Sequence, residues 1–431
     1  MNKIFWVALY RILIFPSIFI GAHVIGLFSP KIREVLRAKY GLIRELRKWS
    51  EDHPECRKNI ILFHAASLGE FEHIRPVLYD LKNRYNTNNI VTFFSPSGFN
   101  NVKTGNGLDH YCYMPFDMIS QWRKIYNILR PVMVVVAKHD VWPAQIWTAG
   151  RLNIPTYLIN ASLSEKSTRS KFIFGRILSV VYREFKTIMT ISEEDTQRFR
   201  KSFTGLRLSV TGDTKYDQVL LRREKAKQNP LLDQNWRNAS KIFVAGSIWP
   251  EDENYLIPAI QKIMAKHEEL KIILVPHQPT RPAITNLKRR FKEYSPVQFS
   301  ALQKKNPRSR VLIVDQIGFL AGLYDFADIA YVGGSFKQGI HNAMEPAIYG
   351  IPVVYGPVHT NSYEAIKLLE AGGAIQVSNQ QDIEETISQL LADKDQASQI
   401  GQLGQAYALS NTGATQKLLN IWGVTLKGEK T

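Results

Sequence analysis

Residues 311–377 alternate between short apolar runs and helical patterns, and this alternation constrains the fold more than any other feature of the chain. The apolar runs lie at 311–314, 329–332, 352–355 and 374–377. Their length and continuous apolar character are typical of strands that are buried on both faces. Strands that alternate with helices in this way form parallel sheets. The sequence therefore predicts an α/β fold built from βα units.

The strand at 329–332 runs into a glycine-rich loop, residues 333–339 (GGSFKQG), and then into a helix. The helix is expected to begin near Asn342, with Glu345 as the second half of a capping box. Such a loop suits a phosphate, because it presents backbone N–H groups and the positive end of the helix dipole. It lacks the spacing of a P-loop and of a dinucleotide fingerprint. The glycines could also serve only to make a tight turn.

An earlier α/β region is expected from strands at 60–63, 91–94, 132–136, 156–159 and 187–191. After its first strand, Ser67 and Glu70 fit the S-x-x-E spacing, so Glu70 could act only as part of a capping box. Taken alone, that structural interpretation is favoured over a catalytic one. Glu72 lies two residues further on, on a different helical face.

Further strands at 242–245 and 271–275 are expected to belong to the same sheet as residues 311–377. The loops that follow three of these strands begin at Gly246, His277 and Gly333. Ligands of open parallel sheets bind at the carboxyl ends of the strands. These loops are therefore expected to converge on one crevice.

The composition restricts the classes of partner. The chain of 431 residues is long enough for two domains, and its only cysteines are Cys56 and Cys112. A disulfide framework or a structural zinc site is not expected, and a reducing cytoplasm fits. The net charge of +17 favours acidic partners. Anionic lipid or a phosphorylated substrate is favoured over nucleic acid, because the sequence contains no nucleic-acid-binding signature.

An apolar run at residues 4–28 is expected to anchor the chain to a membrane. At about 1.5 Å per residue, a helix of this length could cross a hydrocarbon core of about 30 Å. Arg11 is costly at mid-bilayer, so the helix either crosses with Arg11 snorkelling or lies partly in the interface. Basic residues dominate the segment 31–48, and the positive-inside rule places them in the cytoplasm. The alternative is a core helix with a solvated basic face.

Five segments of the sequence together resemble the 3-deoxy-D-manno-octulosonic acid (Kdo) transferases of lipopolysaccharide synthesis. They are HAASLGEFEHIRPVL, VTGDTKYD, VAGSIWPEDE, VLIVDQIGFLAGLYDFADIAYVGGS and GGSFKQGIHNAMEPAIYGIPVVYGP, so the resemblance covers nearly the whole chain. The chain departs from the family pattern at Ile340, where a second glycine is expected. It also departs in segments 138–143 (KHDVWP), 160–164 (NASLS, with Ser162 at its centre) and 276–279 (PHQP, with Gln278 beside His277).

The resemblance implies a GT-B-type fold, with two Rossmann-like domains facing across a cleft and an N-terminal membrane-anchoring helix. The expected divisions are an anchor helix at 1–30, an N-terminal acceptor domain at 31–220, a linker at 221–240, a C-terminal nucleotide-sugar donor domain at 241–405, and a C-terminal helix at 406–431. The last helix is expected to pack back toward the N-terminal domain.

The resemblance also implies the site residues. The family's catalytic glutamate lies in the Gly-Glu segment that matches Glu70, which reverses the preference for a capping role. From the strand-end loops and the donor-site segment together, the expected donor-binding residues are Ser247, His277, Gly333, Gly334, Ser335, Gly339, Asn342 and Glu345, with Glu345 holding the ribose. The implied residues of the acceptor cleft are Ser67, Gly69 and Ser97.

The implied reaction transfers Kdo with inversion from CMP-Kdo to a lipid A precursor (lipid IVA), at the cytoplasmic face of a Gram-negative inner membrane. No cofactor or metal is expected, since the sequence has no paired carboxylates and a monophosphate leaving group needs less neutralisation than a diphosphate. The expected partners are CMP-Kdo, the lipid A precursor and an anionic membrane surface, without nucleic acid or an obligate protein partner. The alternatives are a GT-B transferase that uses a UDP- or GDP-sugar, and a catalytically silent membrane-surface binding protein.

Overall fold

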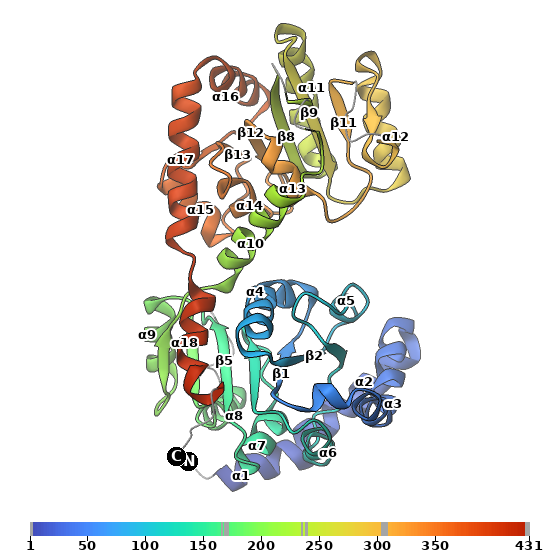
Figure 1. Ribbon diagram of the computed structural model, residues 1–431, viewed down its shortest axis with the longest axis vertical. Helices are drawn as coiled ribbons and strands as arrows, with labels where there is room; N and C mark the ends of the chain where they lie inside the picture. Colours follow the sequence, from blue (N-terminus) through green and yellow to red (C-terminus); the bar gives the residue numbers. More distant parts are fainter. Residues whose placement is uncertain are drawn as a thin grey trace. The chain divides into compact units, whose positions relative to one another are not determined.

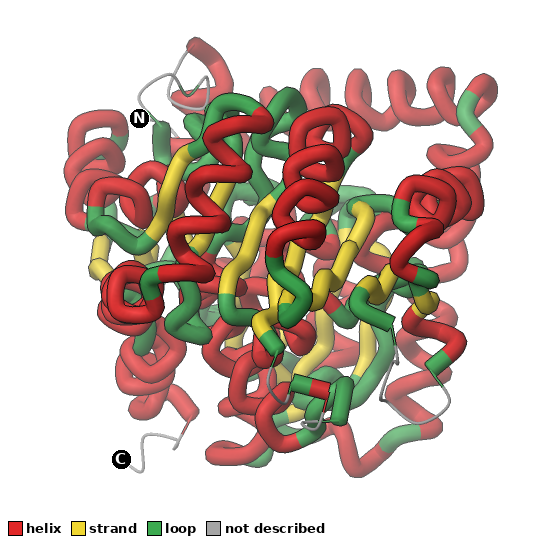
Figure 2. Tube along the Cα trace, turned by 90° about the horizontal axis from the view of Figure 1, so that it is seen from above, coloured by secondary structure: helices red, strands yellow, loops and turns green. Residues whose placement is uncertain are grey.

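The computed structural model describes residues 3–164, 167, 172–233, 236–237, 240–302 and 309–426. It divides the chain into two compact units: unit 1 comprises residues 1–218 and 413–431, and unit 2 comprises residues 219–412. Within the described ranges each unit holds a parallel sheet of seven strands with helices packed against it (Figures 1 and 2). The predicted α/β fold with two Rossmann-like domains is thus confirmed.

The sheet of unit 1 has the strand order of a doubly wound fold. From edge to edge its strands are β3 (His110–Tyr113), β2 (Asn88–Phe93), β1 (Ile60–Ala65), β4 (Met133–Ala137), β5 (Thr156–Ala161), β6 (Thr187–Thr190) and β7 (Leu208–Val210). The helices between them are α4 (Leu68–Tyr85), α5 (Pro96–Phe99), α6 (Ile119–Leu129), α7 (Pro143–Arg151), α8 (Phe172–Tyr182) and α9 (Glu193–Ser202). All strands run in one direction, so their carboxyl ends share one edge.

The central strands of unit 1 are continuously apolar because both faces of the sheet are covered. Ile60 and Leu62 of β1 belong to one hydrophobic cluster, whereas Ile61 and Phe63 belong to another. Successive side chains of a strand point to opposite faces, so the two clusters mark the two sides of the sheet. A strand buried in this way has no polar face, which is why the sequence shows runs rather than alternation.

Unit 2 repeats this order over six strands, has β10 as an additional strand at one edge, and lacks a counterpart of β7 at the other. Its order is β10 (Val297–Gln298), β11 (Val311–Ile313), β9 (Leu270–Pro276), β8 (Lys241–Ile248), β12 (Ile329–Val332), β13 (Val353–Tyr355) and β14 (Ala374–Gln376). Its helices are α11 (Pro250–Lys266), α12 (Arg281–Arg290), α13 (Leu320–Leu323), α14 (Met344–Ala347), α15 (Tyr363–Glu370), α16 (Gln380–Ala392) and α17 (Lys394–Ser410). The neighbouring strands β9, β8 and β12 place His277, Gly246 and Gly333 side by side, although Gly246 still belongs to β8, which extends to Ile248.

The helix expected near Asn342 is shorter than the sequence predicts. Its α-helical part, α14, has four residues, and its N-cap is Ala343. The Asn342 side chain accepts a hydrogen bond from the Met344 N–H at 3.1 Å instead of pairing with Glu345 in a capping box. Pro346 lies inside this turn and has no N–H to extend the ladder of helical hydrogen bonds.

The boundary between the units falls inside a helix. Helix α10 spans Thr214–Gln228, so the stretch expected to be a linker at 221–240 begins as the second half of that helix. At the other end of the chain, helix α18 (Ala414–Leu426) belongs to unit 1. It buries Leu418, Leu419 and Trp422 in the cluster on one face of the unit 1 sheet. Residues 427–431 of the expected C-terminal helix lie outside the described residues.

The N-terminal apolar run forms α1 (Lys3–Leu9), a π-helical turn (Tyr10–Ile14) and α2 (Phe15–Phe28), followed by α3 (Pro30–Asp52). By length and composition alone, Lys3–Phe28 could cross a membrane. Of its most apolar stretch of 18 residues, 22% is buried inside the protein. One stripe, with Trp6, Tyr10 and Phe15, packs into the core of unit 1.

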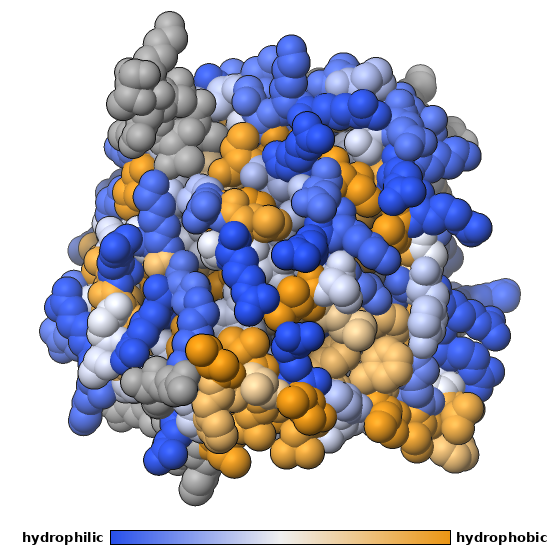
Figure 3. Space-filling model, turned by 90° about the horizontal axis from the view of Figure 1, so that it is seen from below, coloured by the Kyte–Doolittle hydropathy of each residue, from blue (hydrophilic) through white to orange (hydrophobic). Residues whose placement is uncertain are grey.

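The other side of this helix exposes apolar residues. Ile12 is 77% exposed, Ile20 61% and Leu27 69%. In the view from below, hydrophobic side chains, drawn in orange, gather in the lower part of the picture (Figure 3). A buried core helix, the alternative considered from the sequence, does not fit this exposed apolar face.

Asp117 ties the N-terminal helix to the rest of unit 1. Its fully buried carboxylate accepts hydrogen bonds from the Tyr10 hydroxyl (2.7 Å), the Trp122 indole (2.8 Å) and the backbone N–H groups of Ala144 (2.9 Å) and Gln145 (3.0 Å). Four donors satisfy both oxygens, and two of them lie in the first turn of α7. Asp117 is therefore a structural residue that joins α6, α7 and the N-terminal helix.

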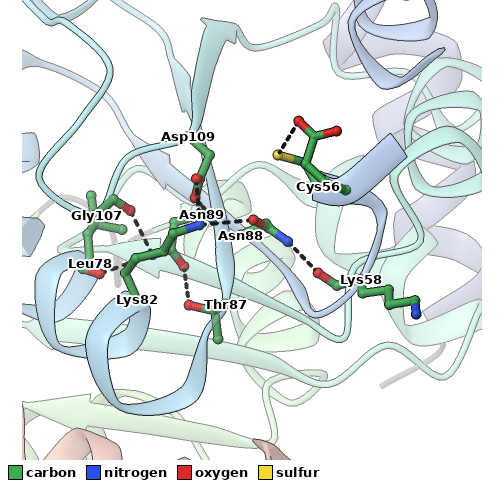
Figure 4. A network of polar contacts seen from close by, with 10 residues as sticks. Cys56, Lys58, Leu78, Lys82, Thr87, Asn88, Asn89, Gly107 and Asp109 are labelled. Atoms are coloured by element: carbon green, nitrogen blue, oxygen red, sulfur yellow. Dashed lines mark hydrogen bonds and ion pairs between the residues drawn. The ribbon is translucent and has the colours of Figure 1, made fainter. Parts of the chain in front are cut away.

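A polar network lies at the amino ends of the unit 1 strands (Figure 4). The buried Asn89 side chain donates to the carbonyl oxygens of Leu78 (3.0 Å) and Gly107 (2.8 Å). Lys82 donates to Asp109 at 2.7 Å, and Asp109 also accepts from the Asn89 N–H at 2.8 Å. These groups satisfy one another, as buried polar groups in a structural role do. This edge of the sheet is therefore structural, whereas ligands of parallel sheets bind at the opposite edge, at the carboxyl ends of the strands.

Candidate functional site

Glu70 lies in the first turn of α4, immediately after the carboxyl end of β1. Its side chain accepts a hydrogen bond from the backbone N–H of Ala66, and the residue is only 9% exposed. Ser67 occupies the N-cap position, but its side chain makes no capping hydrogen bond. The capping interpretation is thus half realised, because Glu70 satisfies a loop N–H while Ser67 does not complete the box.

The surroundings of Glu70 favour its neutral form. Burial raises the pKa of the Glu70 carboxyl, and the negative charge of Asp140 raises it further, against the opposing effects of the Ala66 N–H and of His64. A carboxylate with a raised pKa holds an abstracted proton more firmly, as a general base requires. This electrostatic setting is what the Ser-x-x-Glu spacing alone does not reveal.

His64 and Asp140 stand beside Glu70 and were given no role from the sequence. His64 is fully buried in β1, with Nε2 at 2.9 Å from Asp140 Oδ2 and Nδ1 at 2.9 Å from Thr92 Oγ1. Burial would raise the pKa of Asp140, but the hydrogen bond and charge of His64 outweigh it and lower the pKa. The ionised Asp140 can only accept, so His64 Nε2 carries the hydrogen. The signal for this pair was a histidine inside an otherwise apolar strand next to β4, which ends just before Asp140.

The structure places the expected acceptor residues at the same edge of unit 1. Gly69 and Ser97 are exposed and Ser67 is half-buried. The Ser95 N–H donates to the Ala66 carbonyl at 2.8 Å, which joins the loops that follow β1 and β2. The Ser95 and Ser97 hydroxyls lie 2.9 Å apart. The two serine-bearing loops therefore form one continuous rim around Glu70.

Glu72 belongs to a different environment. Its carboxylate accepts from Arg75 Nε at 2.7 Å and from Gln218 Nε2 at 3.0 Å. An ion pair on the neighbouring helical face leaves it poorly suited to take up a proton. The structure thus separates the two glutamates of this segment in the way the helical spacing predicts.

In unit 2 the glycine-rich loop is tightly held by the chain itself. The Gly333 N–H donates to the Gly246 carbonyl (2.8 Å), the Gly334 N–H to Asp252 (2.7 Å) and the Gly339 N–H to the Gly334 carbonyl (2.8 Å). These amides are therefore not available to a phosphate. Gly334 and Gly339 have φ values of 81° and 100°, which only glycine adopts without strain.

Asp252 organises this loop, although no sequence pattern pointed to it. The buried carboxylate accepts from the Trp249 N–H at 2.8 Å and from the Tyr331 hydroxyl at 2.9 Å, in addition to Gly334. It joins the start of α11 to the loop after β12. Ser335 is also structural, because it is fully buried and its hydroxyl accepts from the Gly356 N–H at 2.7 Å.

Ser247 and Gly333 fit closely against each other. Ser247 has a φ of 53°, a left-handed conformation at the end of β8. A Cβ atom on Gly333 would lie against the Ser247 carbonyl oxygen. Glycine is therefore required at this position for close packing, whatever the loop binds.

Three aromatic rings meet beside these loops. The ring of His277 stacks on Trp249 (4.3 Å between centroids, 16° between planes) and on His341 (4.4 Å, 26°). The Trp249 indole N–H donates to His341 Nε2 at 3.0 Å, so the neutral form of His341 carries its hydrogen on Nδ1. Burial lowers the pKa of both histidines, and for His341 the nearby His277 lowers it further. The result is a platform of three rings, which we call the ring platform.

Glu345, the residue expected to hold a ribose, is held by Arg222 of α10, whose Nη1 lies 2.5 Å from Glu345 Oε1. Of the expected donor residues, the structure brings Ser247, His277, Gly333 and Gly334 together around the ring platform. Trp249 and His341 complete this group and were missed, although each lies close in sequence to a residue that was chosen.

Across the described ranges no cluster of three or more potential metal ligands occurs, and the expected independence of metal stays a prediction.

Comparison with known families gives one match in the N-terminal half. Residues 35–218 match the family described as 3-deoxy-D-manno-octulosonic-acid transferase (kdotransferase). The matched region begins in α3 and contains Glu70, His64 and Asp140.

Curated relatives extend the similarity to most of the chain. The 3-deoxy-D-manno-octulosonic acid transferase of Haemophilus influenzae is 28% identical over 417 residues, which cover 94% of this chain and 95% of that protein. The transferase of the same name from Aquifex aeolicus is 28% identical and covers 78% of this chain and 87% of its own length.

Solved structures show the same fold at low sequence identity. A UDP-GlcNAc 2-epimerase from Neisseria meningitidis, bound to UDP-GlcNAc, has a TM-score of 0.58 at 16% identity, covering 84% of this chain and 98% of its own. A glycosyltransferase from Rickettsia africae has a TM-score of 0.53 at 14% identity, covering 86% and 100%. This similarity supports the GT-B-type fold.

Proposed function

We propose, on the premise that this chain is a glycosyltransferase similar to the Kdo transferases of lipopolysaccharide synthesis over most of its length, that its donor is CMP-Kdo and its acceptor a lipid A precursor. The observation that carries this proposal is the carboxylate of Glu70, buried at the carboxyl edge of unit 1 with a raised pKa. It occupies the Gly-Glu segment in which the resemblance places the catalytic glutamate.

The proposed reaction uses Glu70 as a general base. The carboxylate takes the proton from a sugar hydroxyl of the acceptor while that oxygen forms a bond to the anomeric carbon of Kdo. The bond between the anomeric carbon and the phosphate oxygen breaks, CMP leaves with the electron pair, and the configuration inverts. A positioned base contributes roughly 10²–10⁴-fold. Asp140 supports the step because its charge raises the pKa of Glu70.

The proposed nucleotide contacts lie on unit 2. The ring platform offers flat apolar faces for a base or ribose, and His341 carries a hydrogen on Nδ1 that a phosphate oxygen could accept. Since the amides of Gly333, Gly334 and Gly339 bond within the chain, we assign the loop a positioning role rather than the phosphate contact itself. The ribose contact of Glu345 is retained as part of the proposal.

We propose that the reaction needs no metal ion, because a monophosphate leaving group develops less charge than a diphosphate. Turnover in the presence of EDTA should equal turnover without it. A loss of activity in EDTA that magnesium restores would contradict this part.

The N-terminal helix is proposed to lie in the plane of the membrane surface. One stripe is docked on unit 1 through Trp6, Tyr10 and Phe15, while the remaining apolar side chains are exposed and can enter the headgroup region. The basic residues of α3, such as Arg33, Arg44 and Arg47, would face anionic lipid on the cytoplasmic side of the inner membrane.

Mass spectrometry tests the proposed reaction directly. A lipid A precursor incubated with the protein and CMP-Kdo should gain the mass of one or more Kdo units, and a panel of UDP- and GDP-sugars should add none. Transfer from a UDP- or GDP-sugar instead would establish the rival enzyme. If cells that carry Glu70→Ala had the same phenotype as cells with the wild-type protein, a catalytically silent binding protein would be favoured.

A further inference from the structure

A cavity of about 550 Å³ opens in unit 1 between the N-terminal helices and the loops that follow β2, β3 and β4. Its volume lies within the range of about 300–1,000 Å³ that is typical of small-molecule sites. Its walls are almost entirely apolar, with residues of α2 and α3 on one side and Phe94, Phe116 and Trp142 on the other.

The residues that line the cavity are exposed and apolar at its mouth and buried in its interior. Ile18 and Ile25 line it and are 44% and 54% exposed, so the mouth opens on the exposed apolar face of α2. Phe15, Met114 and Phe116 line it and are buried. An apolar chain could therefore pass from a bilayer into the protein without crossing water.

Lys39 is the unusual feature of the cavity wall. It is 7% exposed, and its ammonium lies 5.3 Å from the centre of the Phe94 ring and 5.7 Å from that of Phe116. In the part of the chain that the structure describes, it makes no hydrogen bond and no ion pair. Asp117, the carboxylate that also lines the cavity, accepts from four other donors. Burial lowers the pKa of Lys39 to about 8.

The interior of the cavity lies close to the proposed base. Asp140 acts electrostatically on Lys39 and on Glu70 alike. Trp142, two residues beyond Asp140, lines the cavity and stacks on Phe94 at 5.4 Å. A molecule that filled the cavity would therefore present its polar end next to Glu70.

We propose that this cavity holds one acyl chain of the acceptor and that Lys39 pairs with a phosphate of the same molecule. The inference rests on the proposed function and deepens it. A purely apolar ligand would leave the buried ammonium unpaired, and a purely polar anion would leave the apolar walls wet. Only an anionic amphiphile satisfies both. The acyl chain lies toward the mouth, beside Ile18 and Ile25, and the headgroup lies at the interior end beside Lys39, so the bound chain positions the sugar hydroxyl near Glu70.

The first experiment fills the cavity. A Cβ atom at Gly21 meets no heavy atom within 4 Å, and Gly21 lines the cavity, so Gly21→Phe can enter it without a clash. The matched control is Val24→Phe, on the exposed face of the same helix and outside the cavity. Gly21→Phe should raise KM for the acylated acceptor at least tenfold and leave the KM for CMP-Kdo unchanged, while Val24→Phe should change neither.

The second experiment varies the acceptor. Successive shortening of its acyl chains should weaken binding to the wild type by up to about fourfold per methylene, the equivalent of ~0.8 kcal/mol. In Gly21→Phe this dependence should flatten. Equal KM values for the acylated and the fully deacylated disaccharide phosphate would overturn the cavity proposal and leave Kdo transfer itself intact.

The third experiment removes the charge. Lys39→Met should raise KM roughly 10- to 100-fold for the phosphorylated acceptor, as expected for loss of a charge-assisted bond. It should have little effect on a dephosphorylated acceptor. Lys124→Met, on the exposed surface of α6 and outside the cavity, serves as the control. An equal loss on both acceptors would overturn the assigned role of Lys39.

Direct labelling keeps the proposal testable if no sugar transfer is found. A disaccharide phosphate whose acyl chain carries a diazirine should, on irradiation, label peptides containing residues 15–25 and 94–116, and Gly21→Phe should abolish that labelling. A diazirine-bearing phosphatidylglycerol tests the other source of an acyl chain. If it labels the same peptides and the acceptor does not compete, the cavity holds bilayer lipid and the proposal is overturned.

Discussion

The two Rossmann-like units share the order of six strands but differ in what they present at the carboxyl ends of their strands. In unit 1 the loops carry ionisable groups close together, and Glu70 is held with a raised pKa beside Asp140. In unit 2 the equivalent loops bond to one another through Asp252 and present uncharged rings. The topology therefore fixes where a site lies, and the loop residues decide whether it performs proton transfer or holds a ligand.

The largest effect should come from the charged edge of unit 1. Replacing the proposed base in Glu70→Gln keeps the shape of the side chain but removes proton acceptance, so kcat should fall roughly 10²–10⁴-fold. The KM for the donor should change little. The rate of Kdo transfer measures this, with Glu72→Gln as control because Glu72 is ion-paired with Arg75. A normal kcat in Glu70→Gln would contradict the proposal that the unit 1 edge performs proton transfer.

The tightly bonded edge of unit 2 should respond in stability. Gly333→Ala would push a Cβ atom against the Ser247 carbonyl oxygen, and overpacking of this kind typically costs ~1–3 kcal/mol. Thermal or urea unfolding should show unit 2 destabilised. Gly69→Ala is the counterpart in unit 1, where the nearest atom to a new Cβ is Ser67 Oγ at 3.8 Å, and unfolding should be unchanged. Equal tolerance at both glycines would show that the two edges do not differ in packing.

A smaller effect should appear in donor binding. His277→Ala removes the ring that stacks on both Trp249 and His341, and loss of such stacking should raise the KM for the donor roughly tenfold with kcat nearly unchanged. His267→Ala, outside the ring platform, is the control. A fall in kcat without a change in donor KM would place His277 in the chemical step instead.

The smallest effect concerns the pH dependence of the reaction. The base must be ionised to act, and burial raises the pKa of Glu70. The value of kcat/KM should therefore fall as pH drops through that raised pKa, approaching tenfold per unit, and level off above it. The pH profile of Asp140→Asn should have its acid limb at lower pH, since the carboxylate charge that raises the pKa of Glu70 is gone. An acid limb at the ordinary pKa of glutamate in the wild type would contradict the proposed environment.

The sequence predicted the central strands well because their burial on both faces leaves an unbroken apolar run, as in β1, β4 and β12. It missed β3, β7 and β10, which are short edge strands with polar residues such as His110 and Gln298. Pairing with one neighbour, rather than composition, makes these strands. The short helix α14 was overestimated for a similar reason, since Asn342 bonds locally to Met344.

The candidate site was predictable in position but not in its electrostatics. The location of Glu70 follows from its place after a buried strand. Its partner Asp140 lies 70 residues further along the chain, and its partner His64 lies in β1. Only the parallel register of β1 and β4 brings these residues together. Asp252 was invisible for the same reason, because its bond to Gly334 joins segments separated by 82 residues.

The hydrogen bond between Tyr10 and Asp117 means that the N-terminal helix is not a detachable tail. Trimming the chain at residue 30 to obtain an easily handled soluble enzyme would strip a buried carboxylate of one of its donors. It would also remove one wall of the cavity that Lys39 lines. In a shortened protein of that kind, we expect the cavity to be open to water on that side.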